Sequence, residues 1–255
     1  MGKKEIVITK GLYTGYSDKQ IVCENINAHI ERGSLTCLIG RNGAGKSTLM
    51  RTMCGFLKPI HGEVLLDGKK IEDYSHNALS RRLSVVLTEI ISEINYLTVR
   101  SVVEMGRYPY CNCFASLSHE DYDIVDKSMK IVGIEDLAGK SMAALSDGQR
   151  QKVMIARALA QDTSVIVLDE PLSFLDMPSR IEIMKLLRDI AHTQEKAILL
   201  SSHDIELALH FADRLWVIDR NSHIYTTNAP YTDSSSIIDD VFGGQSILVK
   251  EFLKA

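Results

Sequence analysis

The chain has 255 residues, of which 45% are hydrophobic and 24% charged, so it can bury one large core, or a core with a smaller lobe. Its net charge of -4 argues against a broad basic surface, and therefore against nucleic acid as the partner. Five cysteines, an odd number, suit a reducing compartment better than a disulfide framework. Charged residues interrupt every apolar run well short of a membrane span, so we expect no membrane crossing by this chain alone.

Short β-rich segments dominate the N-terminal part of the chain. Partial alternation of apolar and polar residues predicts strands at 5–9, 21–30, 34–40 and 62–68. The last of these segments ends in an Asp-Gly pair, which is typical of a turn. We interpret the group as a mixed sheet at the N-terminal end.

The segment GRNGAGKST, residues 40–48, follows the apolar run LTCLI and precedes a helix expected to begin near Lys46. The spacing of a phosphate-binding loop is satisfied by Gly40, Gly45, Lys46 and Ser47. In such a loop backbone N–H groups surround the phosphates, Lys46 would reach the β- and γ-phosphates, and Ser47 would ligate Mg²⁺. A chance glycine-rich turn is the weaker interpretation, because strand, loop, lysine and hydroxyl are all in register.

From Thr98 to about Ala144 the pattern changes to helix. Apolar residues recur three and four positions apart in 98–108 and again in 120–134. We interpret this part as an inserted helical lobe.

The segment LSDGQRQ, residues 145–151, has the pattern of a helix start. Ser146 and Gln149 are spaced as a capping box, and Asp147 would lie in the first turn. Gly148 does not fit, because glycine inside a helical turn costs up to about 1 kcal/mol relative to alanine. The capping box therefore leaves the bare backbone at this position unexplained.

Helices and strands alternate in the rest of the chain. The predicted helices are 149–161, 180–192 and 205–214, and the predicted strands are 164–170, 197–202 and 215–219. This alternation implies a parallel sheet covered on both faces, with functional groups at the carboxyl ends of its strands.

Two of these strand ends carry candidate catalytic groups. Asp169 and Glu170 end the first strand and should point in different directions. Asp169 would support the Mg²⁺ shell, often through water, and Glu170 would orient and polarise the water that attacks the γ-phosphate. His203 follows the next strand and could hydrogen-bond the same phosphate. Each residue alone could be an ordinary polar strand end, but the phosphate loop favours the functional interpretation.

In combination the motifs resemble those of the nucleotide-binding subunit of ABC transporters, over nearly the whole chain. GRNGAGKST is similar to Walker A, VIVLDE to Walker B with a catalytic Glu170, SFLD to the D-loop and LSDGQ to the signature LSGGQ, with His203 as the switch histidine.

The resemblance implies an α/β fold. We expect a P-loop NTPase core with a RecA-like mixed or parallel sheet, an N-terminal antiparallel β-subdomain and an inserted α-helical subdomain. The core with its β-subdomain would comprise 1–88 and 160–255 of a single ABC ATPase domain, and the helical signature subdomain 89–159.

The resemblance also implies an ATPase that uses Mg²⁺ and converts ATP and water to ADP and phosphate. Its catalytic residues would be Lys46, Glu170 and His203. The implied nucleotide-binding residues are Tyr16, Gly40, Asn42, Gly43, Ala44, Gly45, Lys46, Ser47, Thr48, Ser146, Gly148 and Asp176. Tyr16 would stack on adenine, although a core or surface tyrosine is an equally good interpretation.

A single phosphate loop surrounds only part of the γ-phosphate, so a second copy of the chain should complete the site with the N-terminus of its signature helix. The resulting head-to-tail homodimer would bury two ATP molecules, and hydrolysis by Glu170 would let the halves part. The partner's phosphate would then require the bare backbone of Gly148. Asp147 replaces the first signature glycine, and its side chain can point away from the anion.

The chain departs from the family pattern at the end of the strand that enters the helical lobe. The family has a glutamine there, whereas this chain has Thr88 followed by Glu89, and no glutamine occurs between Gln20 and Gln149. We favour Thr88 with water as the replacement near Mg²⁺, because an added carboxylate beside the γ-phosphate would cost electrostatic energy. Glu89 reaching in and water alone are the alternatives.

A single cassette without fused membrane helices or long heptads resembles an importer subunit that docks on a separate permease. The segment TVRSVVEMGRYPY, residues 98–110, is similar to one found in importers of iron–siderophore complexes, heme and cobalamin. The resemblance implies permease docking near 89–115, a position on the cytoplasmic face of the inner membrane and an external substrate-binding protein. In the alternative interpretation, the segment is a plain amphipathic helix, with Tyr108, Pro109 and Tyr110 in lobe packing.

Two other functions remain open on the sequence alone. One is an ABC importer of a different substrate, because the cassette does not touch the cargo. The other is a soluble P-loop ATPase or kinase without a permease, which would have no need of LSDGQ.

Overall fold

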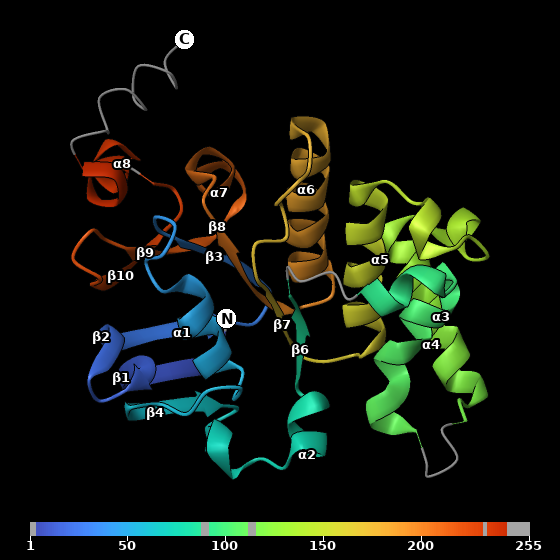
Figure 1. The fold of residues 1–255 in the computed structure, drawn as a ribbon, viewed down its shortest axis with the longest axis horizontal. Coiled ribbons are helices and arrows are strands. Elements are labelled where there is room, and N and C mark those ends of the chain that lie inside the picture. Colours follow the sequence, from blue (N-terminus) through green and yellow to red (C-terminus); the bar gives the residue numbers. More distant parts are fainter. Residues whose placement is uncertain (1–3, 88–91, 112–115, 232–233, 244–255) are drawn as a thin grey trace.

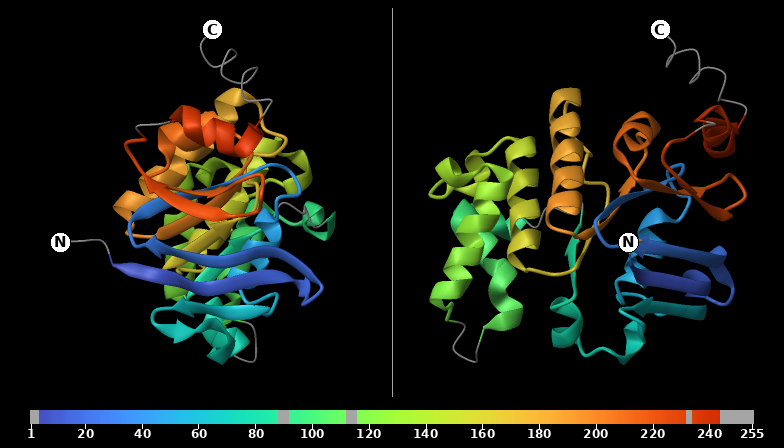
Figure 2. Two further views of the ribbon diagram at one scale, coloured as in Figure 1. Left: turned by 90° about the vertical axis from the view of Figure 1, so that its left-hand side faces the viewer. Right: turned by 180° about the vertical axis from the view of Figure 1, so that it is seen from behind.

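The fold is known from a computed structural model, which describes residues 4–87, 92–111, 116–231 and 234–243. Figure 1 shows two sheets joined to a lobe of helices at one side, and the view from behind in Figure 2 shows the same separation. Thr88 and Glu89 lie outside the described residues.

A four-stranded antiparallel sheet with the order β2-β1-β4-β5 forms the N-terminal subdomain. Its strands are β1 (Glu5–Ser17), β2 (Gln20–Glu31), β4 (His61–Leu66) and β5 (Lys69–Lys70). The expected antiparallel subdomain is confirmed, but the mixed N-terminal sheet is wrong, because the predicted strand at 34–40 joins the other sheet. β1 is also longer than predicted: Gly11, at φ 50°, and several register shifts against β2 carry it through the GLYTGY segment.

The central sheet has six strands in the order β10-β9-β3-β8-β7-β6. They are β3 (Ser34–Ile39), β6 (Leu83–Val86), β7 (Val165–Leu168), β8 (Ala197–Ser202), β9 (Arg214–Ile218) and β10 (Ile224–Asn228). Neighbouring strands are parallel, except that β10 runs antiparallel to β9. β10 was not predicted, because its residues are only partly buried and carry no apolar run.

Both faces of the central sheet are covered. In β3, Leu35, Cys37 and Ile39 join one core and Leu38 joins the other, as the two-residue period of a strand requires. The helices of the first core include α5 (Asp147–Ala160), α6 (Met177–Thr193), α7 (Ile205–Phe211) and α8 (Ser234–Phe242). The second core joins the sheet to α1 (Lys46–Met53) and to the antiparallel subdomain.

The helical lobe is inserted between β6 and β7. It contains α3 (Val99–Glu104), a 3₁₀ helix at Met105–Tyr110, α4 (His119–Val132) and the first turns of α5, with shorter 3₁₀ turns at Ser92–Tyr96, Glu135–Leu137 and Met142–Ala144. The helix predicted at 98–108 thus changes to 3₁₀ geometry at Met105, ahead of Pro109, which cannot donate a backbone hydrogen bond. A further short helix, α2 (His76–Ser80), leads into β6.

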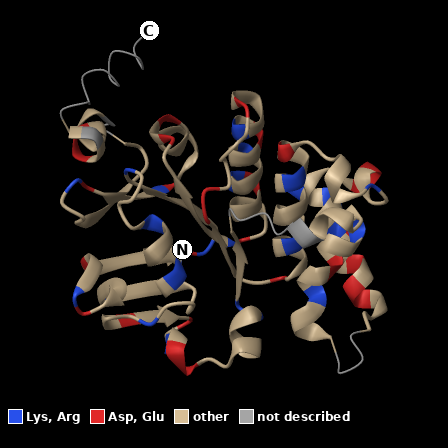
Figure 3. Cartoon of the chain, in the orientation of Figure 1, with Lys and Arg blue, Asp and Glu red and all other residues tan. Residues whose placement is uncertain are grey.

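Charged residues of both signs are interspersed over the sheets and the lobe (Figure 3). In the part of the chain that the structure describes, no helix combines the length and the apolar character needed to span a bilayer.

Candidate nucleotide-binding site

The phosphate loop connects β3 to α1, and α1 begins at Lys46 as predicted. Gly43 and Gly45 have φ values of 79° and 98°, in the left-handed region that favours glycine. A β-carbon added at Gly45 would collide with Val22 Cγ1 of β2, whereas the space beside Gly43 is open. The loop is thus held against the antiparallel sheet while its backbone stays accessible to a phosphate chain.

Lys46 is held at the base of this loop. Its Nζ donates hydrogen bonds to the carbonyls of Gly40 at 3.0 Å and Arg41 at 3.2 Å, and the residue is only 5% exposed. The same Nζ lies 3.6 Å from Glu170 Oε1. The loop lysine and the predicted catalytic glutamate therefore face each other across the site.

A pocket at this loop is lined by Tyr16, Val22, Asn42, Gly43, Gly45, Lys46, Ser47, Thr48 and Glu170. Two other residues of the loop that were predicted to bind nucleotide do not line this pocket. Gly40 is buried, with Ile218 Cβ 3.0 Å from the position of an added β-carbon, and Ala44 packs partly against the second core. The glycine backbones and the Ser47 hydroxyl suit a nucleotide with Mg²⁺, so the residues present fit both groups.

Tyr16 lies at the rim of the pocket near the end of β1. Its hydroxyl is 3.4 Å from Thr48 Oγ1, and the residue is 56% exposed. The ring is therefore accessible to a planar ligand, and stacking on adenine stays a prediction.

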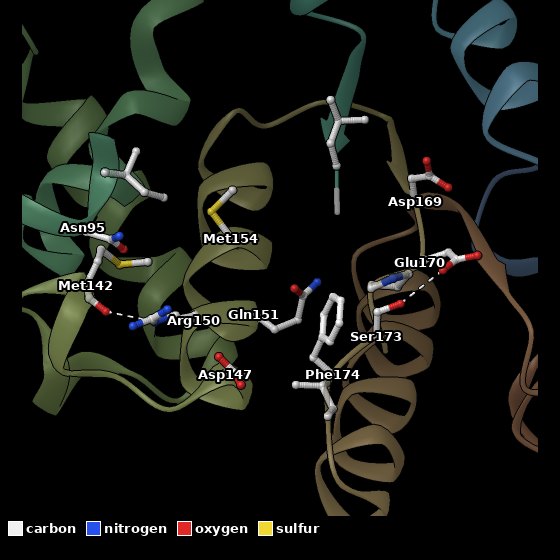
Figure 4. A pocket seen from close by; sticks show the side chains of 14 residues that line it. Asn95, Met142, Asp147, Arg150, Gln151, Met154, Asp169, Glu170, Ser173 and Phe174 are labelled. Atoms are coloured by element: carbon white, nitrogen blue, oxygen red, sulfur yellow. Dashed lines mark hydrogen bonds between the residues drawn. The ribbon is translucent and has the colours of Figure 1, made fainter. Parts of the chain in front are cut away.

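The two acidic residues follow β7 directly. Ser201 Oγ donates to Asp169 Oδ1 at 2.7 Å and accepts from the Glu170 backbone N–H at 2.8 Å. Ser173 Oγ donates to Glu170 Oε2 at 3.2 Å, as Figure 4 shows. The sequence interpretation missed both serines as contacts of the acids. The contact of Ser201 depends on the adjacency of β7 and β8, whereas that of Ser173 depends on the path of the loop directly after Glu170.

His203 directly follows β8, at the same edge of the sheet. Its side chain is exposed and is not among the residues that line the phosphate-loop pocket. Its contact with a γ-phosphate stays a prediction.

The signature segment begins α5 as a capping box. Ser146 Oγ accepts from the Gln149 backbone N–H at 3.3 Å, and the Gln149 side-chain oxygen accepts from the Ser146 N–H at 3.2 Å. The structure does not bring Ser146 or Gly148 to the phosphate-loop pocket of their own chain.

Asp176 of the SFLD segment caps α6, where its carboxylate accepts from the Ser179 backbone N–H at 3.1 Å. Hydrogen bonding to Ser179 holds the pKa of this carboxyl below its usual value. Like the signature residues, Asp176 lies outside the phosphate-loop pocket of its own chain.

Residues 23–173, more than half of the chain, match the family model described as ABC transporter. The chain belongs to the ABC transporter family. ABC transporter ATP-binding proteins are ATPases, so this ABC cassette binds and hydrolyses ATP.

Two relatives and one solved structure agree with this assignment. The cassette is 46% identical over 216 residues to an uncharacterized ABC transporter ATP-binding protein of Methanocaldococcus jannaschii, covering 85% of this chain and 74% of that protein. It is 37% identical over 224 residues to the achromobactin transport ATP-binding protein of Dickeya dadantii, covering 88% and 82%. It superimposes with a TM-score of 0.81 at 25% identity on a metal-chelate type ABC transporter solved in an inward-facing conformation, covering 94% and 89%. Further relatives are named for siderophore, iron-hydroxamate and cobalamin import.

A second cavity of the ABC cassette lies between the helical lobe and the segment that follows β7. Apolar side chains including Leu87, Met154 and Phe174 line it, together with both acids that follow β7. Figure 4 shows Gln151 directed from α5 across this cavity toward the segment that carries Ser173 and Phe174. The cavity thus connects the signature helix with the acidic end of β7.

Part of the segment 98–110 packs within the helical lobe. Arg107 is buried, with its Nε 2.8 Å from Asp121 Oδ1 and its Nη1 donating to the Ala160 carbonyl at 2.8 Å. The Tyr110 hydroxyl donates to the Gln161 carbonyl at 3.0 Å. Tyr108 is 58% exposed and therefore remains available to a partner.

Proposed function

We propose that this cassette energises uptake of an iron chelate such as a siderophore, of heme or of cobalamin, as the ATP-hydrolysing subunit of an importer. Relatives named for siderophore and cobalamin import support this substrate class. The observation that carries the catalytic part is the arrangement of Lys46 Nζ 3.6 Å from Glu170 Oε1 at the mouth of the phosphate loop.

In the proposed reaction the loop backbone and Lys46 bind the β- and γ-phosphates of ATP. Ser47 and Asp169 would hold Mg²⁺, which neutralises charge that develops on the phosphates. Glu170 orients and polarises the attacking water, and Ser173 fixes one oxygen of its carboxylate. His203, exposed at the end of β8, would contact the γ-phosphate from the same edge of the sheet.

The proposed active unit is a head-to-tail homodimer. The phosphate-loop pocket is formed without Ser146, Gly148 or Asp176 of the same chain, so these residues are free to contribute to the site of a second copy. The start of α5 would supply backbone N–H groups and a helix dipole to the partner's γ-phosphate.

The permease would dock near residues 89–115, holding the cassette peripherally at the cytoplasmic face of the membrane. In the described part of this region, Tyr96 is 91% exposed and Tyr108 58% exposed. Exposed aromatic side chains of this kind are enriched in protein interfaces. The complete system would include an external substrate-binding protein.

The catalytic and dimeric parts are tested together by gel filtration with Mg²⁺ and ATP. Glu170→Gln should move from monomer to dimer, because it keeps the nucleotide site but cannot complete hydrolysis. Lys46→Ala should stay monomeric, and Glu24→Gln, an exposed change on β2, should behave as the unmodified chain. A Glu170→Gln chain that binds ATP yet stays monomeric would contradict the proposed ATP-dependent dimer and would favour an ATPase that acts without a permease.

The substrate class is tested by co-purifying the membrane partner and reconstituting it in liposomes. Transport of an iron chelate, heme or cobalamin that depends on ATP and on Lys46 is the expected result. Transport of another solute only would leave the ATPase assignment intact and remove the proposed cargo.

A further inference from the structure

Ser201 is the buried group that connects the two acids of the site. It is 0% exposed and lies between Asp169 Oδ1, at 2.7 Å, and the Glu170 backbone nitrogen, at 2.8 Å. We propose that Ser201 is a positioning residue for ATP hydrolysis, which holds the carboxylate of Asp169 and the main chain of Glu170 in a fixed relation. The inference rests on the proposed roles of the two acids.

The direction of both hydrogen bonds at Ser201 is determined by its partners. An ionised carboxylate can only accept and a backbone N–H can only donate, so the single hydroxyl proton goes to Asp169 and an oxygen lone pair accepts from Glu170. The bond to Asp169 is assisted by the charge of the carboxylate, which makes it shorter and stronger than a neutral one. One rigid hydroxyl thus fixes two neighbouring residues.

The backbone at Glu170 needs such support. Its φ of 45° lies in the left-handed region, which is unfavourable for a residue with a β-carbon. The hydrogen bond from its N–H to Ser201 stabilises this conformation. In it the Glu170 carboxylate lies 3.6 Å from Lys46 Nζ, with Ser173 Oγ on its other oxygen at 3.2 Å.

The register of the sheet explains why β8 can supply this group. β7 pairs with β8 in parallel, with Leu168 opposite Leu200, and β7 ends at Leu168. β8 continues to Ser202, so its Ser201 side chain reaches the two residues that follow β7. The next serine contacts a different residue: Ser202 Oγ accepts a hydrogen bond from the Asp204 backbone N–H at 2.9 Å.

The test compares Ser201→Ala with Ser84→Ala. Ser84 is also buried, at 1% exposed, and its hydroxyl donates to the Val165 carbonyl at the opposite end of β7. Removing the Ser201 hydroxyl should lower kcat by about 10- to 100-fold, the effect of losing a hydrogen bond to a charged group. The KM for ATP should change by less than about threefold, and the Mg²⁺ concentration for half-maximal activity should rise severalfold. Ser84→Ala should leave kcat within about twofold.

A second variant, Ser201→Cys, distinguishes loss of the hydrogen bond from a failure of the chain to fold. Ser201→Cys nearly keeps the side-chain volume but donates only weakly, so it should fold and lose kcat as Ser201→Ala does. Full activity of Ser201→Cys would overturn the inference. So would equal losses of kcat in Ser201→Ala and Ser84→Ala, or a parallel loss of ATP binding and kcat in Ser201→Ala.

Glu170→Gln, measured beside these variants, distinguishes a failure of the proposed catalytic role of Glu170 from a failure of the role of Ser201. If Glu170→Gln hydrolyses ATP normally, the proposed catalytic role of Glu170 fails. If Glu170→Gln is inactive and Ser201→Ala is not impaired, only the role of Ser201 fails.

Discussion

Gly148 of α5 packs against Ser179 of α6. A β-carbon added at Gly148 would lie 3.2 Å from Ser179 Oγ and 3.5 Å from its Cβ. The ion pair of Lys152 with Glu182, with Nζ and Oε1 2.6 Å apart, lies in the same α5–α6 contact. The bare backbone of the signature therefore has a use within one chain, in addition to the proposed approach of a partner's phosphate.

Replacing Gly148 should be far more damaging than replacing its neighbour. We expect Gly148→Asp to abolish ATP-driven dimerisation, because the new carboxylate would face both Ser179 and the partner's phosphate. Asp147→Gly should be nearly silent, since Asp147 is exposed. Gel filtration with Mg²⁺ and ATP in the Glu170→Gln background measures both, and equal damage would contradict the assignment.

A second pair of variants distinguishes the two uses of Gly148. Gly148→Ala should impair dimerisation, and adding Ser179→Gly removes the contact within the chain. If dimerisation stays impaired in the double variant, the partner's phosphate requires the glycine. Recovery would mean that packing against α6 is the whole explanation.

Gly106→Ala should destabilise the fold. An added β-carbon would collide with the carbonyl oxygen of Arg157 and lie 3.0 Å from Ala160 Cβ. Overpacking of this kind costs about 1–3 kcal/mol, which denaturant unfolding would detect. Gly139→Ala is the matched control, because no heavy atom lies within 4 Å of its added β-carbon, and it should change stability by less than about 1 kcal/mol.

The ion pair of Asp121 predicts a dependence of stability on pH. Burial raises the pKa of Asp121, but hydrogen bonds from Ser118 and the ion pair with Arg107 outweigh it, and the net pKa is lowered. A lowered folded-state pKa stabilises the fold above the unfolded value of about 3.9, and this contribution is lost as the pH falls through the folded-state pKa.

Denaturant unfolding between pH 7 and pH 3 measures this contribution. Asp121→Asn should be less stable at pH 7 and should lose less stability on acidification than the unmodified chain. Asp123→Asn, an exposed change on the same helix, is the control. Identical pH profiles for Asp121→Asn and the unmodified chain would contradict the expectation.

ATP hydrolysis should not require a glutamine at position 88. We expect the chain with Thr88 to show Mg²⁺-dependent turnover, and Thr88→Gln to change the rate only modestly. Measurements of phosphate release with and without the permease test this. No turnover in either condition, with turnover restored by Thr88→Gln, would disprove it.

The sequence predicted the parts of this molecule that local patterns define. The phosphate loop, the start of α1 at Lys46 and the capping box at Ser146 all rest on contacts between residues close together in the chain, and each is found. The length of β1 was underestimated, because bulges rather than strict alternation carry it past Gly11. α8 was also missed, since its Ser- and Asp-rich sequence resembles a loop and only its contact with the sheet buries Ile237.

Contacts between residues far apart in the sequence could not be predicted from local patterns. Ser201 is 32 residues from Asp169, and only the adjacency of β7 and β8 brings them together. The conflict at Gly148 was visible in the sequence, but its neighbour Ser179 was not. The segment 98–110 was interpreted by its resemblance to an importer segment, and the buried contacts of Arg107 were not predicted. Its partners Asp121 and Ala160 lie on later helices.

The two ends of α5 are attached very differently. At its C-terminal end the Gln161 side chain donates to the carbonyls of Ser80 and Leu83, and Arg157 donates to the carbonyl of Val85. These bonds tie the helix to β6 and to the end of α2. At its signature end, the ties to α6 include one ion pair and one close approach. Arg150, also near the signature end, donates to the carbonyls of Met142 and Ala143 within the lobe. α5 therefore connects the edge strand of the central sheet to the lobe and to α6, and its 14 residues span about 21 Å between these attachments.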